Sequence, residues 1–312
     1  MSGPFVGDGA PSPGAPGRRP GEPGASYPDG LRGLVEDYLE RLDFGAVAPA
    51  RPLVDAMRYS LLAGGKRIRP VLCLAVAERL GEPPQRVLPF AAALELIHTY
   101  SLIHDDLPAI DDDSLRRGRP TCHVVFGEDI AILAGDGLFA EAFRLITDRQ
   151  QSAPAHLVAA LSEVAWATGV QGMVGGQYMD VTATAGRDDE LRLLHSLKTG
   201  RLIEASVAGG ALLCGVEGEA LELHRAFARE IGLLFQIVDD ILDVEGDAEA
   251  LGKTAGKDER QAKTTYVSRY GLEGARRLAG ESHARARARL GDLGGDVASL
   301  AAVADYIYRR RS

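Results

Sequence analysis

The chain has 312 residues, of which 46% are hydrophobic, and its formal net charge is −9, from 35 Lys and Arg against 44 Asp and Glu. This acidic balance argues against non-specific nucleic-acid binding, which depends on neutralising phosphates with basic side chains. The three cysteines, Cys73, Cys122 and Cys214, are odd in number, widely spaced and flanked by apolar residues, which indicates reduced thiols in a cytoplasmic protein.

Residues 1–30 contain seven Pro and eight Gly and almost no large apolar residues. Such a segment cannot bury enough surface to offset its ordering entropy, which predicts a disordered tail followed by one domain over 31–312. The tail lacks the apolar stretch of a signal peptide. The longest uncharged stretch, 164–179, has 16 residues with four Gly and is too short for a membrane helix, so we expect no membrane span.

From Leu31 onward, apolar residues recur at the three- and four-residue steps of amphipathic helices, and strand signals are absent. The helical ranges are rich in Ala and Leu and are broken by Gly, Pro or Asp. The pattern predicts an all-α fold, a single large helical bundle with a central cavity. The main helices are expected at 31–42, 87–103, 130–146, 156–171, 190–209, 219–244 and 272–290.

Two aspartate clusters each follow an apolar helical run, with Asp105, Asp106 and Asp111 in the first and Asp239 and Asp243 in the second. A proline two residues after Asp106 should end that helix, so Asp111 returns from a loop. Carboxylates gathered at the mouth of a core repel one another strongly unless they are neutralised. One such cluster alone would favour a solvated turn or helix cap. Two clusters predict Mg²⁺ ions that bridge a phosphate or diphosphate between them.

Two basic segments belong with these acids. Paired glycines that end at Gly65 permit close backbone approach, and they are followed by cations that include Lys66 and Arg69. This segment fits a diphosphate cradle and a helix-start loop with solvated cations about equally. Arg116 and Arg117 form the second segment, whose guanidinium groups suit phosphate oxygens, with an ordinary surface turn as the alternative.

Three further segments carry polar groups. Lys198 and Thr199 precede a glycine inside an apolar helix, which indicates a kink that turns a lysine and a backbone carbonyl toward the cavity, with a snorkelling lysine as the alternative. Lys253 and Lys257 lie in a Gly-rich loop that lacks the spacing and the preceding strand of a Walker loop. The segment 172–180 is typical of close helix packing with a polar group at the core, and we assign it no chemistry.

The segments GGKRIRP, DDLPAIDDDSLRRGRPT, GGQ, KTG and LLFQIVDDILDVEGD occur in this order. Together they resemble the short-chain trans-isoprenyl (polyprenyl) diphosphate synthases, an all-helical family that condenses isopentenyl diphosphate with allylic diphosphates. The match runs from about Leu31 to the C-terminus. The four-residue gap between Asp106 and Asp111 resembles the first aspartate motif of the bacterial enzymes, above all bacterial farnesyl diphosphate synthase.

The resemblance implies a role for each candidate residue. Three Mg²⁺ ions around the allylic diphosphate would be held by Asp105, Asp106, Asp111, Asp239 and Asp243. The allylic substrate would be surrounded by Arg116, Lys198, Thr199, Gln236 and Lys253. Isopentenyl diphosphate would be held by Gly65, Lys66, Arg69, His98 and Arg117. Without the resemblance, His98 would be read as a satisfied core histidine, and the role of Lys257 stays open.

The chemistry implied is ionisation followed by condensation. Magnesium and the cations take up charge on the departing diphosphate, which leaves an allylic carbocation in a cavity that excludes water. Isopentenyl diphosphate attacks this cation, and the released diphosphate accepts the final proton. The carbonyl of Thr199 and the side chain of Gln236 are expected to help as dipoles. The resemblance also hints at a homodimer.

Tyr100 and Ser101 lie five and four residues before Asp105, about one turn deeper on the helix. Each added isoprene unit buries five carbons at ~0.8 kcal/mol each, or roughly 4 kcal/mol, so only a steric floor can stop elongation. Tyr100 is the bulky candidate, with core packing as the alternative. The resemblance places an aromatic residue here in farnesyl-forming bacterial enzymes and smaller residues in geranylgeranyl-forming ones. We therefore expect mainly C15 farnesyl diphosphate, with C20 as the alternative.

Two rival functions fit the sequence less well. A terpene cyclase would need an Asn/Ser/Glu metal motif at the second site, where this chain has Asp239, Asp240 and Asp243. A non-catalytic subunit that modulates an active synthase usually loses aspartates or basic groups, and here all are present.

Overall fold

The structure is a computed structural model, and it describes the chain in the ranges 27–45, 47–182, 187–249 and 264–310. Most of the expected tail therefore lies outside the described residues, as do Lys253 and Lys257. The first helix begins at Asp29, so the expected domain boundary at residue 30 falls inside this helix.

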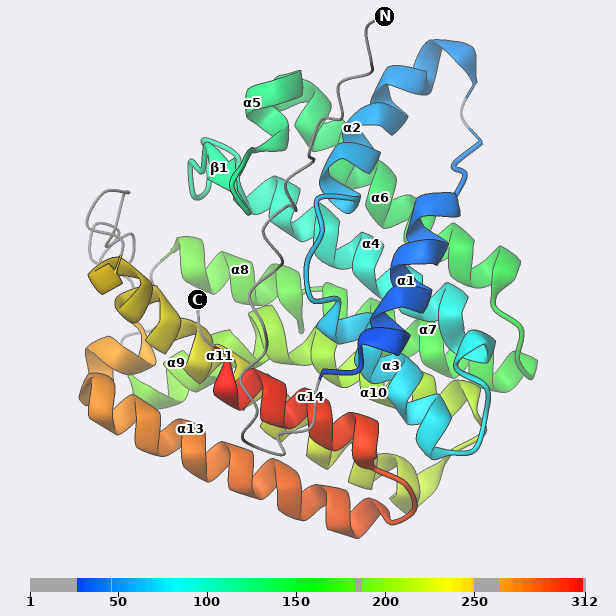
Figure 1. Ribbon diagram of the computed structural model, residues 1–312. Coiled ribbons are helices and arrows are strands. Elements are labelled where there is room, and N and C mark those ends of the chain that lie inside the picture. The colour runs from blue at the N-terminus through cyan, green and yellow to red at the C-terminus, as the bar shows by residue number, and fades with distance from the viewer. Residues whose placement is uncertain (1–26, 46, 183–186, 250–263, 311–312) are drawn as a thin grey trace, which may run out of the picture.

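The described residues are mostly helical (Figure 1). The longer helices are α1 (Asp29–Arg41), α2 (Arg51–Leu61), α3 (Ile68–Arg79), α4 (Leu88–Asp105), α6 (Glu128–Arg149), α7 (Pro154–Thr168), α10 (Arg201–Leu213), α11 (Gly218–Glu249), α13 (Tyr266–Leu293) and α14 (Ala298–Arg309). The short elements are η1 (Ala48–Ala50), η2 (Pro84–Val87), β1 (Leu115–Arg116), β2 (Arg119–Pro120), α5 (Cys122–Phe126), α8 (Met173–Val181), α9 (Asp188–His195) and η3 (Ser196–Gly200).

The all-α fold class is confirmed, and every range expected to be helical is helical over most of its length. The expected helix 190–209 consists of three elements, α9, a π-helical turn η3 and α10. The expected helix 156–171 is too long, because α7 ends at Thr168, where Gly169 leaves the helical conformation. Helices α2, α3 and α14 were not expected from the sequence.

The expectation of no strands was wrong at one place. Strands β1 and β2, of two residues each, form an antiparallel hairpin in which Arg116 pairs with Arg119. The residues between them, Arg117 and Gly118, have φ values of 53° and 72°. Positive φ at both central residues matches the tight turn that best fits the twist of a hairpin. Strands this short carry no periodicity that a sequence pattern could reveal.

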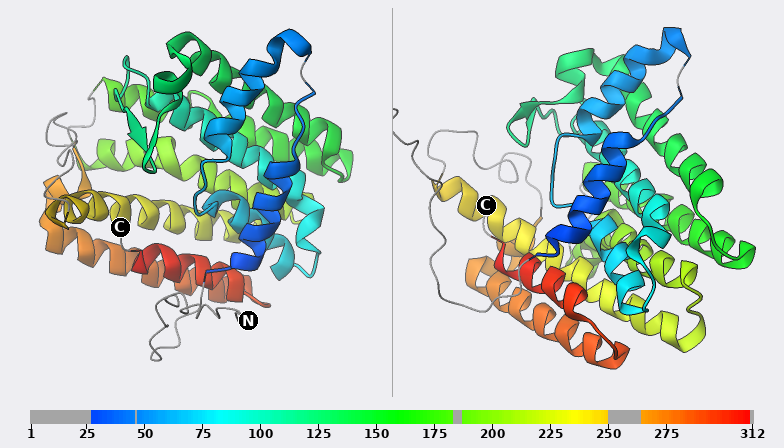
Figure 2. Two further views of the ribbon diagram at one scale, coloured as in Figure 1. Left: turned by 45° about the horizontal axis from the view of Figure 1, so that its top comes forward. Right: turned by 45° about the vertical axis from the view of Figure 1, so that its right-hand side comes forward.

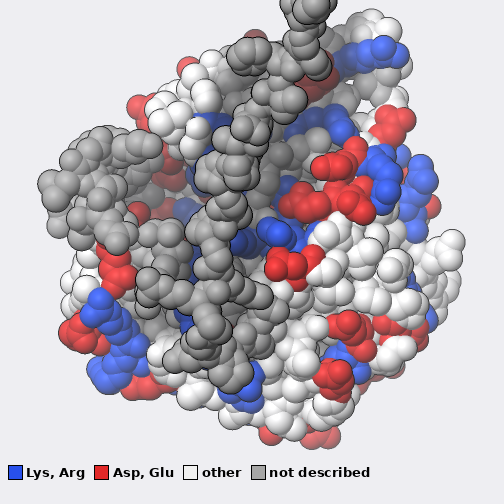
Figure 3. Space-filling model, viewed as in Figure 1, with Lys and Arg blue, Asp and Glu red and all other residues white. Residues whose placement is uncertain are grey.

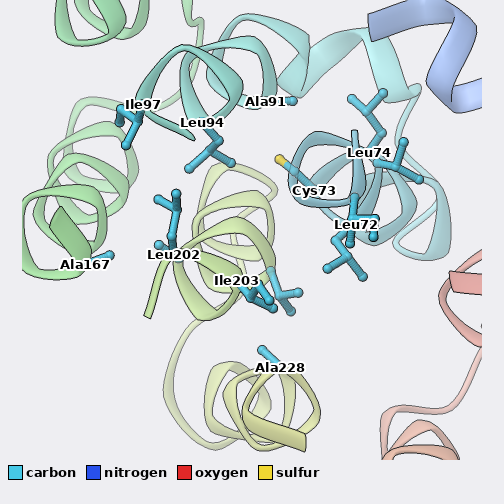
Figure 4. Packing of buried hydrophobic residues seen from close by; sticks show 14 of the residues in the cluster. Leu72, Cys73, Leu74, Ala91, Leu94, Ile97, Ala167, Leu202, Ile203 and Ala228 are labelled. Atoms are coloured by element: carbon cyan, nitrogen blue, oxygen red, sulfur yellow. The ribbon is translucent and has the colours of Figure 1, made fainter. Parts of the chain in front are cut away.

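Helix α10 lies at the centre of the bundle, since every residue from Leu202 to its end is buried. It packs against α3, α7 and α11, while α4 packs against α3 and α6. Figure 4 shows side chains of these helices, among them Leu94 of α4 and Cys73 of α3, pointing into the space that they share. Small residues allow the close approach, because a Cβ at Gly209 would lie only 2.3 Å from the ring of Phe90. The core is one contiguous cluster.

The outer elements leave one side of the bundle for the site. Helix α13 lies beside α11 and α14 (Figures 1 and 2). The hairpin, α8 and the C-terminal part of α11 lie on the same side of the bundle (Figure 1). Figure 3 shows that acidic and basic side chains are intermixed over the described part of the face in view. The net negative charge is therefore not gathered into one patch on that face.

Two helical segments of the described chain are long and apolar enough to cross a membrane, Pro84–Asp105 and Pro154–Val181. Length and composition alone are weak evidence, because core helices pass the same test. The first segment is 61% buried and contributes α4 to the core. The second is 33% buried and is divided between α7 and α8. The absence of a membrane span stays a prediction.

Candidate active site

A cavity of about 980 Å³ opens beside the C-terminal end of α4. Its walls come from α3, α4, the hairpin, α8, α9, η3 and α11. Twelve of the residues predicted for the site line this cavity, namely Arg69, His98, Tyr100, Ser101, Asp105, Arg116, Arg117, Lys198, Thr199, Gln236, Asp239 and Asp243. The structure therefore brings together segments that are up to 174 residues apart, from Arg69 to Asp243.

The first aspartate of the first cluster, Asp105, ends α4 and faces the cavity. Burial raises the pKa of Asp105 to about 6, and the negative charges of Asp111 and Asp106 add to this rise, whereas Lys198 and Arg116 oppose it. The loop after α4 returns as expected, because the backbone N–H of Asp111 donates to the carbonyl of Asp105 over 2.9 Å. Asp111 itself does not line the cavity.

The second aspartate of this cluster, Asp106, has a different position from the one predicted. It is buried, and both of its carboxylate oxygens accept hydrogen bonds from Arg116 at 2.6–2.9 Å. This paired, charge-assisted contact orients the guanidinium group of Arg116, which lines the cavity. In this structure Asp106 therefore positions a basic residue of the site, and it does not line the large cavity.

The second cluster repeats this arrangement on α11. Asp239, Asp240 and Asp243 all line the cavity, and Asp240 is the buried one, at 5% exposure. Asp240 accepts one hydrogen bond from the side chain of Gln236 (2.8 Å) and another from the backbone N–H of Tyr266 (2.7 Å). The amide oxygen of Gln236 in turn accepts from the hydroxyl of Thr199 at 3.2 Å. Asp240 thus fixes the orientation of the predicted catalytic amide.

The predicted kink at Lys198 is the π-helical turn η3. The ammonium group of Lys198 lies 2.6 Å from a carboxylate oxygen of Asp180 on α8. The close approach of α8 depends on Gly176, where a Cβ would lie 2.3 Å from the backbone nitrogen of Lys198. Lys198 is therefore held at the cavity by a partly buried ion pair and does not extend into solvent as a snorkelling side chain would.

A second basic group lines the cavity at Arg69, His98 and Arg117. Arg117 donates to the carbonyl of Gly64, and its guanidinium lies so close to Gly65 that a Cβ there would be 2.7 Å from one of its nitrogens. The Nε of Arg69 is buried without a hydrogen-bond partner among the described residues. Burial lowers the pKa of His98 well below its usual value, and the surrounding arginines lower it further. His98 is therefore neutral at pH 7.

The remaining cations of the first basic segment do not reach the cavity. Arg67 is buried and donates to Glu95 (2.7 Å) and Glu36 (2.9 Å), so it anchors the loop. Lys66 is exposed, and its ammonium lies 5.3 Å from the centroid of the Tyr306 ring. The role predicted for Lys66 stays a prediction, since the structure places it outside the cavity lining.

The C-terminal Arg310 is a cation that the sequence did not predict for the site. It forms an ion pair with Asp239, and its guanidinium carbon lies 4.8 Å from the centroid of the Phe235 ring. Both Asp239 and Phe235 line the cavity. Arg310 thus shares a carboxylate that was predicted to bind metal.

At Tyr100 the wall of the cavity is backed by two aromatic side chains that do not themselves line it, Phe139 and Phe143. The Tyr100 ring packs edge-on against Phe139 of α6 at 5.0 Å and against His104 at 5.5 Å, and Phe143 follows behind Phe139 at 5.1 Å. Burial raises the pKa of Tyr100 to about 12. The hydroxyl of Ser101 donates to the carbonyl of His98, so it is used within the helix. Tyr100 is the bulky group in this part of the wall.

The carboxylates fit magnesium. Asp105, Asp239 and Asp243 line the same cavity, and all three offer the hard oxygen ligands that Mg²⁺ prefers. The raised pKa of Asp105 indicates a buried carboxylate that a nearby cation would stabilise. Among the described residues, no three His, Cys, Asp or Glu side chains are close enough to hold an ion by themselves. Substrate oxygens would therefore have to complete the coordination.

Several polar residues that line the cavity were not predicted as site residues, among them Gln177, Asp180 and His195. Burial lowers the pKa of His195 to about 4, and its ring stacks on Tyr266 at 5.4 Å. Gln177 and Asp180 are three residues apart and share one face of α8. That spacing was visible in the sequence, but nothing in it showed that the face points at Lys198.

Comparisons with known proteins show the family to which the chain belongs. The family model described as polyprenyl synthetase matches residues 50–297. The chloroplastic geranylgeranyl pyrophosphate synthase of Capsicum annuum is 49% identical over 261 residues, which cover 82% of this chain and 71% of that protein. The geranylgeranyl diphosphate synthase of Cyanophora paradoxa is 43% identical over 285 residues, which cover 89% and 94%.

A solved structure is similar as well. An FPP/GFPP synthase from Zymomonas mobilis superposes with a TM-score of 0.77 at 36% identity, and the match covers 89% of this chain and 99% of that one. Similarity at this level holds for sequence and fold alike. With two aspartate clusters and two basic groups around one cavity, the chain belongs to the polyprenyl synthetase family and is a trans-prenyl diphosphate synthase.

Proposed function

We propose that this enzyme adds isopentenyl diphosphate to allylic diphosphates until it reaches C20 geranylgeranyl diphosphate. The observation that carries the proposal is the similarity, at 43–49% identity, to relatives named geranylgeranyl diphosphate synthases. C20 geranylgeranyl diphosphate therefore replaces the C15 product as the leading candidate. Support for C15 comes from one residue, Tyr100, whereas the similarity to these relatives extends over most of the chain.

Two groups of basic residues support separate positions for the two diphosphates. Lys198 and Arg116 lie near Asp105, on the side of the cavity proposed for the allylic substrate. Arg69 and Arg117 lie near His98, on the side proposed for isopentenyl diphosphate. When bound, Mg²⁺ would draw charge from the departing diphosphate, with Asp105, Asp239 and Asp243 as its protein ligands.

A C15 product is the second candidate, and Tyr100 is the observation that favours it. The Tyr100 ring stands on the helix that carries Asp105, five residues earlier, and Phe139 supports it from behind. A rigid aromatic pair there would stop a chain that grows along α4. The similar Zymomonas mobilis protein is named an FPP/GFPP synthase, and this name refers to two products of different chain length.

Product analysis separates these candidates. The enzyme is incubated with isopentenyl diphosphate and dimethylallyl diphosphate, with and without Mg²⁺, and the products are separated by chromatography after dephosphorylation. We expect geranylgeraniol as the main alcohol and no product without Mg²⁺. Farnesol as the main product would favour the second candidate. Turnover in neither condition would instead indicate a non-catalytic subunit.

We also propose a homodimer. Six large apolar side chains along α7, α8 and the segment between them are 49–80% exposed, and together they form an apolar face: Val158, Trp166, Val170, Val174, Tyr178 and Val181. Exposed apolar patches of this kind mark interaction sites. Val174, Tyr178 and Val181 also line the cavity, so the part of this face that is left for a partner is Val158, Trp166 and Val170. A second copy of the chain could cover this part symmetrically.

Light scattering after size-exclusion chromatography tests the dimer. We expect about twice the chain mass of 33.2 kDa for the wild type, and monomers for Trp166→Asp. A wild-type monomer would refute the proposal. A cytoplasmic location is proposed as well, supported by Cys73, Cys122 and Cys214, which are free cysteines.

A further inference from the structure

Gln177 on α8 has a buried side-chain amide that the protein does not use. Both its amide nitrogen and its amide oxygen are buried, and neither has a hydrogen-bond partner in the described part of the chain. A buried polar group left unpaired costs about 1–3 kcal/mol. Unpaired groups of this kind in a native structure call for an explanation, and a ligand that supplies the missing contact is one. Gln177 also lines the cavity, so a bound substrate can reach it.

Two other glutamines show what a protein-paired amide looks like. The amide oxygen of Gln150 accepts from the backbone of Phe90 (3.1 Å), and its nitrogen donates to the carbonyl of Arg86 (2.8 Å). Gln236 is paired at both ends as well, with Thr199 and Asp240. The unpaired state of Gln177 is therefore not a general property of buried glutamines in this fold.

Gln177 precedes Asp180 on α8 much as Gln236 precedes Asp240 on α11, and all four residues line the cavity. Asp180, one turn after Gln177 on α8, holds the ammonium of Lys198 near the diphosphate position. Asp240, one turn after Gln236 on α11, lies in the second aspartate cluster. Each glutamine is therefore about one helical turn from an acid that lines the cavity. An allylic diphosphate held beside these acids would bring its first carbons within reach of both amides.

We propose that Gln177 is a catalytic residue whose amide oxygen stabilises the allylic cation from the side of α8, facing the Thr199 and Gln236 pair. The inference rests on the proposed prenyl transfer. The C1–O bond of the allylic diphosphate breaks with its electron pair leaving on the diphosphate, and positive charge spreads over C1 and C3. The double bond of isopentenyl diphosphate supplies the electrons of the new C–C bond, and the released diphosphate accepts the proton lost from C2 of the isopentenyl unit.

A neutral amide suits this task better than a carboxylate. An oriented dipole interacts strongly with the positive charge only when that charge develops in the transition state. It therefore lowers the activation barrier without tightening substrate binding. A carboxylate at the same place could bond covalently to the cation and would repel the diphosphate. The unpaired amide oxygen of Gln177 keeps its lone pairs free for the substrate, whereas the oxygen of Gln236 already accepts from Thr199.

The test compares Gln177→Met with Gln150→Leu as a matched control, and Gln177→Leu serves as a second variant. For Gln177→Met we expect kcat for one condensation to fall about 10- to 100-fold. This decrease is smaller than the one that follows removal of an oxyanion-hole donor. The KM values for both substrates and the Kd for inorganic diphosphate with Mg²⁺ should stay within about threefold. Its Tm should be equal or higher, because an unpaired amide is removed. Gln150→Leu should instead lower Tm by roughly 5 °C and leave kcat unchanged.

Three results would overturn the role of Gln177. The first is wild-type kcat in Gln177→Met and Gln177→Leu. The second is a raised KM for the allylic substrate, or weaker diphosphate binding, at unchanged kcat, because that would make Gln177 a diphosphate contact. The third is a fall in Tm like that of Gln150→Leu, which would make it a packing residue. Failure of the proposed function is distinguishable, since in that case the wild type itself would show no turnover.

Discussion

Replacing Tyr100 with alanine should lengthen the product by at least one isoprene unit. The ring lines the cavity, and it is held edge-on against Phe139 at 5.0 Å and His104 at 5.5 Å. Removing it opens the space between the growing chain and Phe139. Phe143 lies behind Phe139 at 5.1 Å, so a second aromatic layer remains and should set a new, longer limit.

The magnitudes favour elongation over disruption. One further isoprene unit buries five carbons, which is worth roughly 4 kcal/mol if the new space is apolar. Losing the two ring contacts of Tyr100 costs about 0.5–1.5 kcal/mol each. Tyr100 is half-buried, so its truncation should cost less than the ~3–5 kcal/mol of a fully buried aromatic residue. We expect Tm to fall by roughly 5 °C at most, with the fold retained.

The assay measures chain length by mass spectrometry of the dephosphorylated products, at equal substrate ratios for each variant. Tyr38→Ala is the control, because Tyr38 is also half-buried against the core but does not line the cavity. That variant should lose stability without changing product length. An active Tyr100→Ala enzyme with the wild-type product distribution would refute Tyr100 as the floor. A longer product in Phe139→Ala alone would then place the floor on α6.

Three further predictions concern charge. Asp105→Ala and Asp239→Ala should each lower turnover by at least ~10²-fold with circular dichroism unchanged, whereas activity in Asp239→Ala with normal Mg²⁺ dependence would contradict a shared metal–diphosphate unit. Arg117→Ala should raise KM mainly for isopentenyl diphosphate, by a cost of about 2–4 kcal/mol, and an equal effect on both substrates would contradict separate cradles. Burial lowers the pKa of His195 from 6.5 to about 4. As the pH falls, the unfolded state therefore takes up this proton before the folded state does, and the free energy of unfolding should fall by about 3 kcal/mol between pH 6.5 and pH 4. Urea unfolding of His195→Gln should show a smaller loss over this range, and an identical loss would contradict the assignment.

The fold and the two clusters could be predicted because they rest on periodicity and on composition. Asp105 and Asp239 follow apolar runs, and their charge required a partner whatever the details of packing. The split within each cluster could not be predicted. Asp106 and Asp105 are adjacent carboxylates in the sequence, and only the path of the hairpin places Arg116 against Asp106. The same holds for Lys66, which stands beside buried Arg67 in the sequence but is exposed in the structure.

The split has a common physical cause in both clusters. Neighbouring residues on a helix point about 100° apart, so two adjacent aspartates are not equally exposed, and Asp106 and Asp240 are the more buried members of their pairs. A carboxylate turned inward needs hydrogen-bond donors. Asp106 receives them from Arg116, and Asp240 receives them from Gln236 and the backbone of Tyr266. Each pair of aspartates therefore divides two roles. The more exposed carboxylate offers oxygen to a cation, and the more buried one fixes the orientation of a group that lines the cavity. The amide of Gln177 has no such partner among the described residues, which is the observation behind its proposed contact with the substrate.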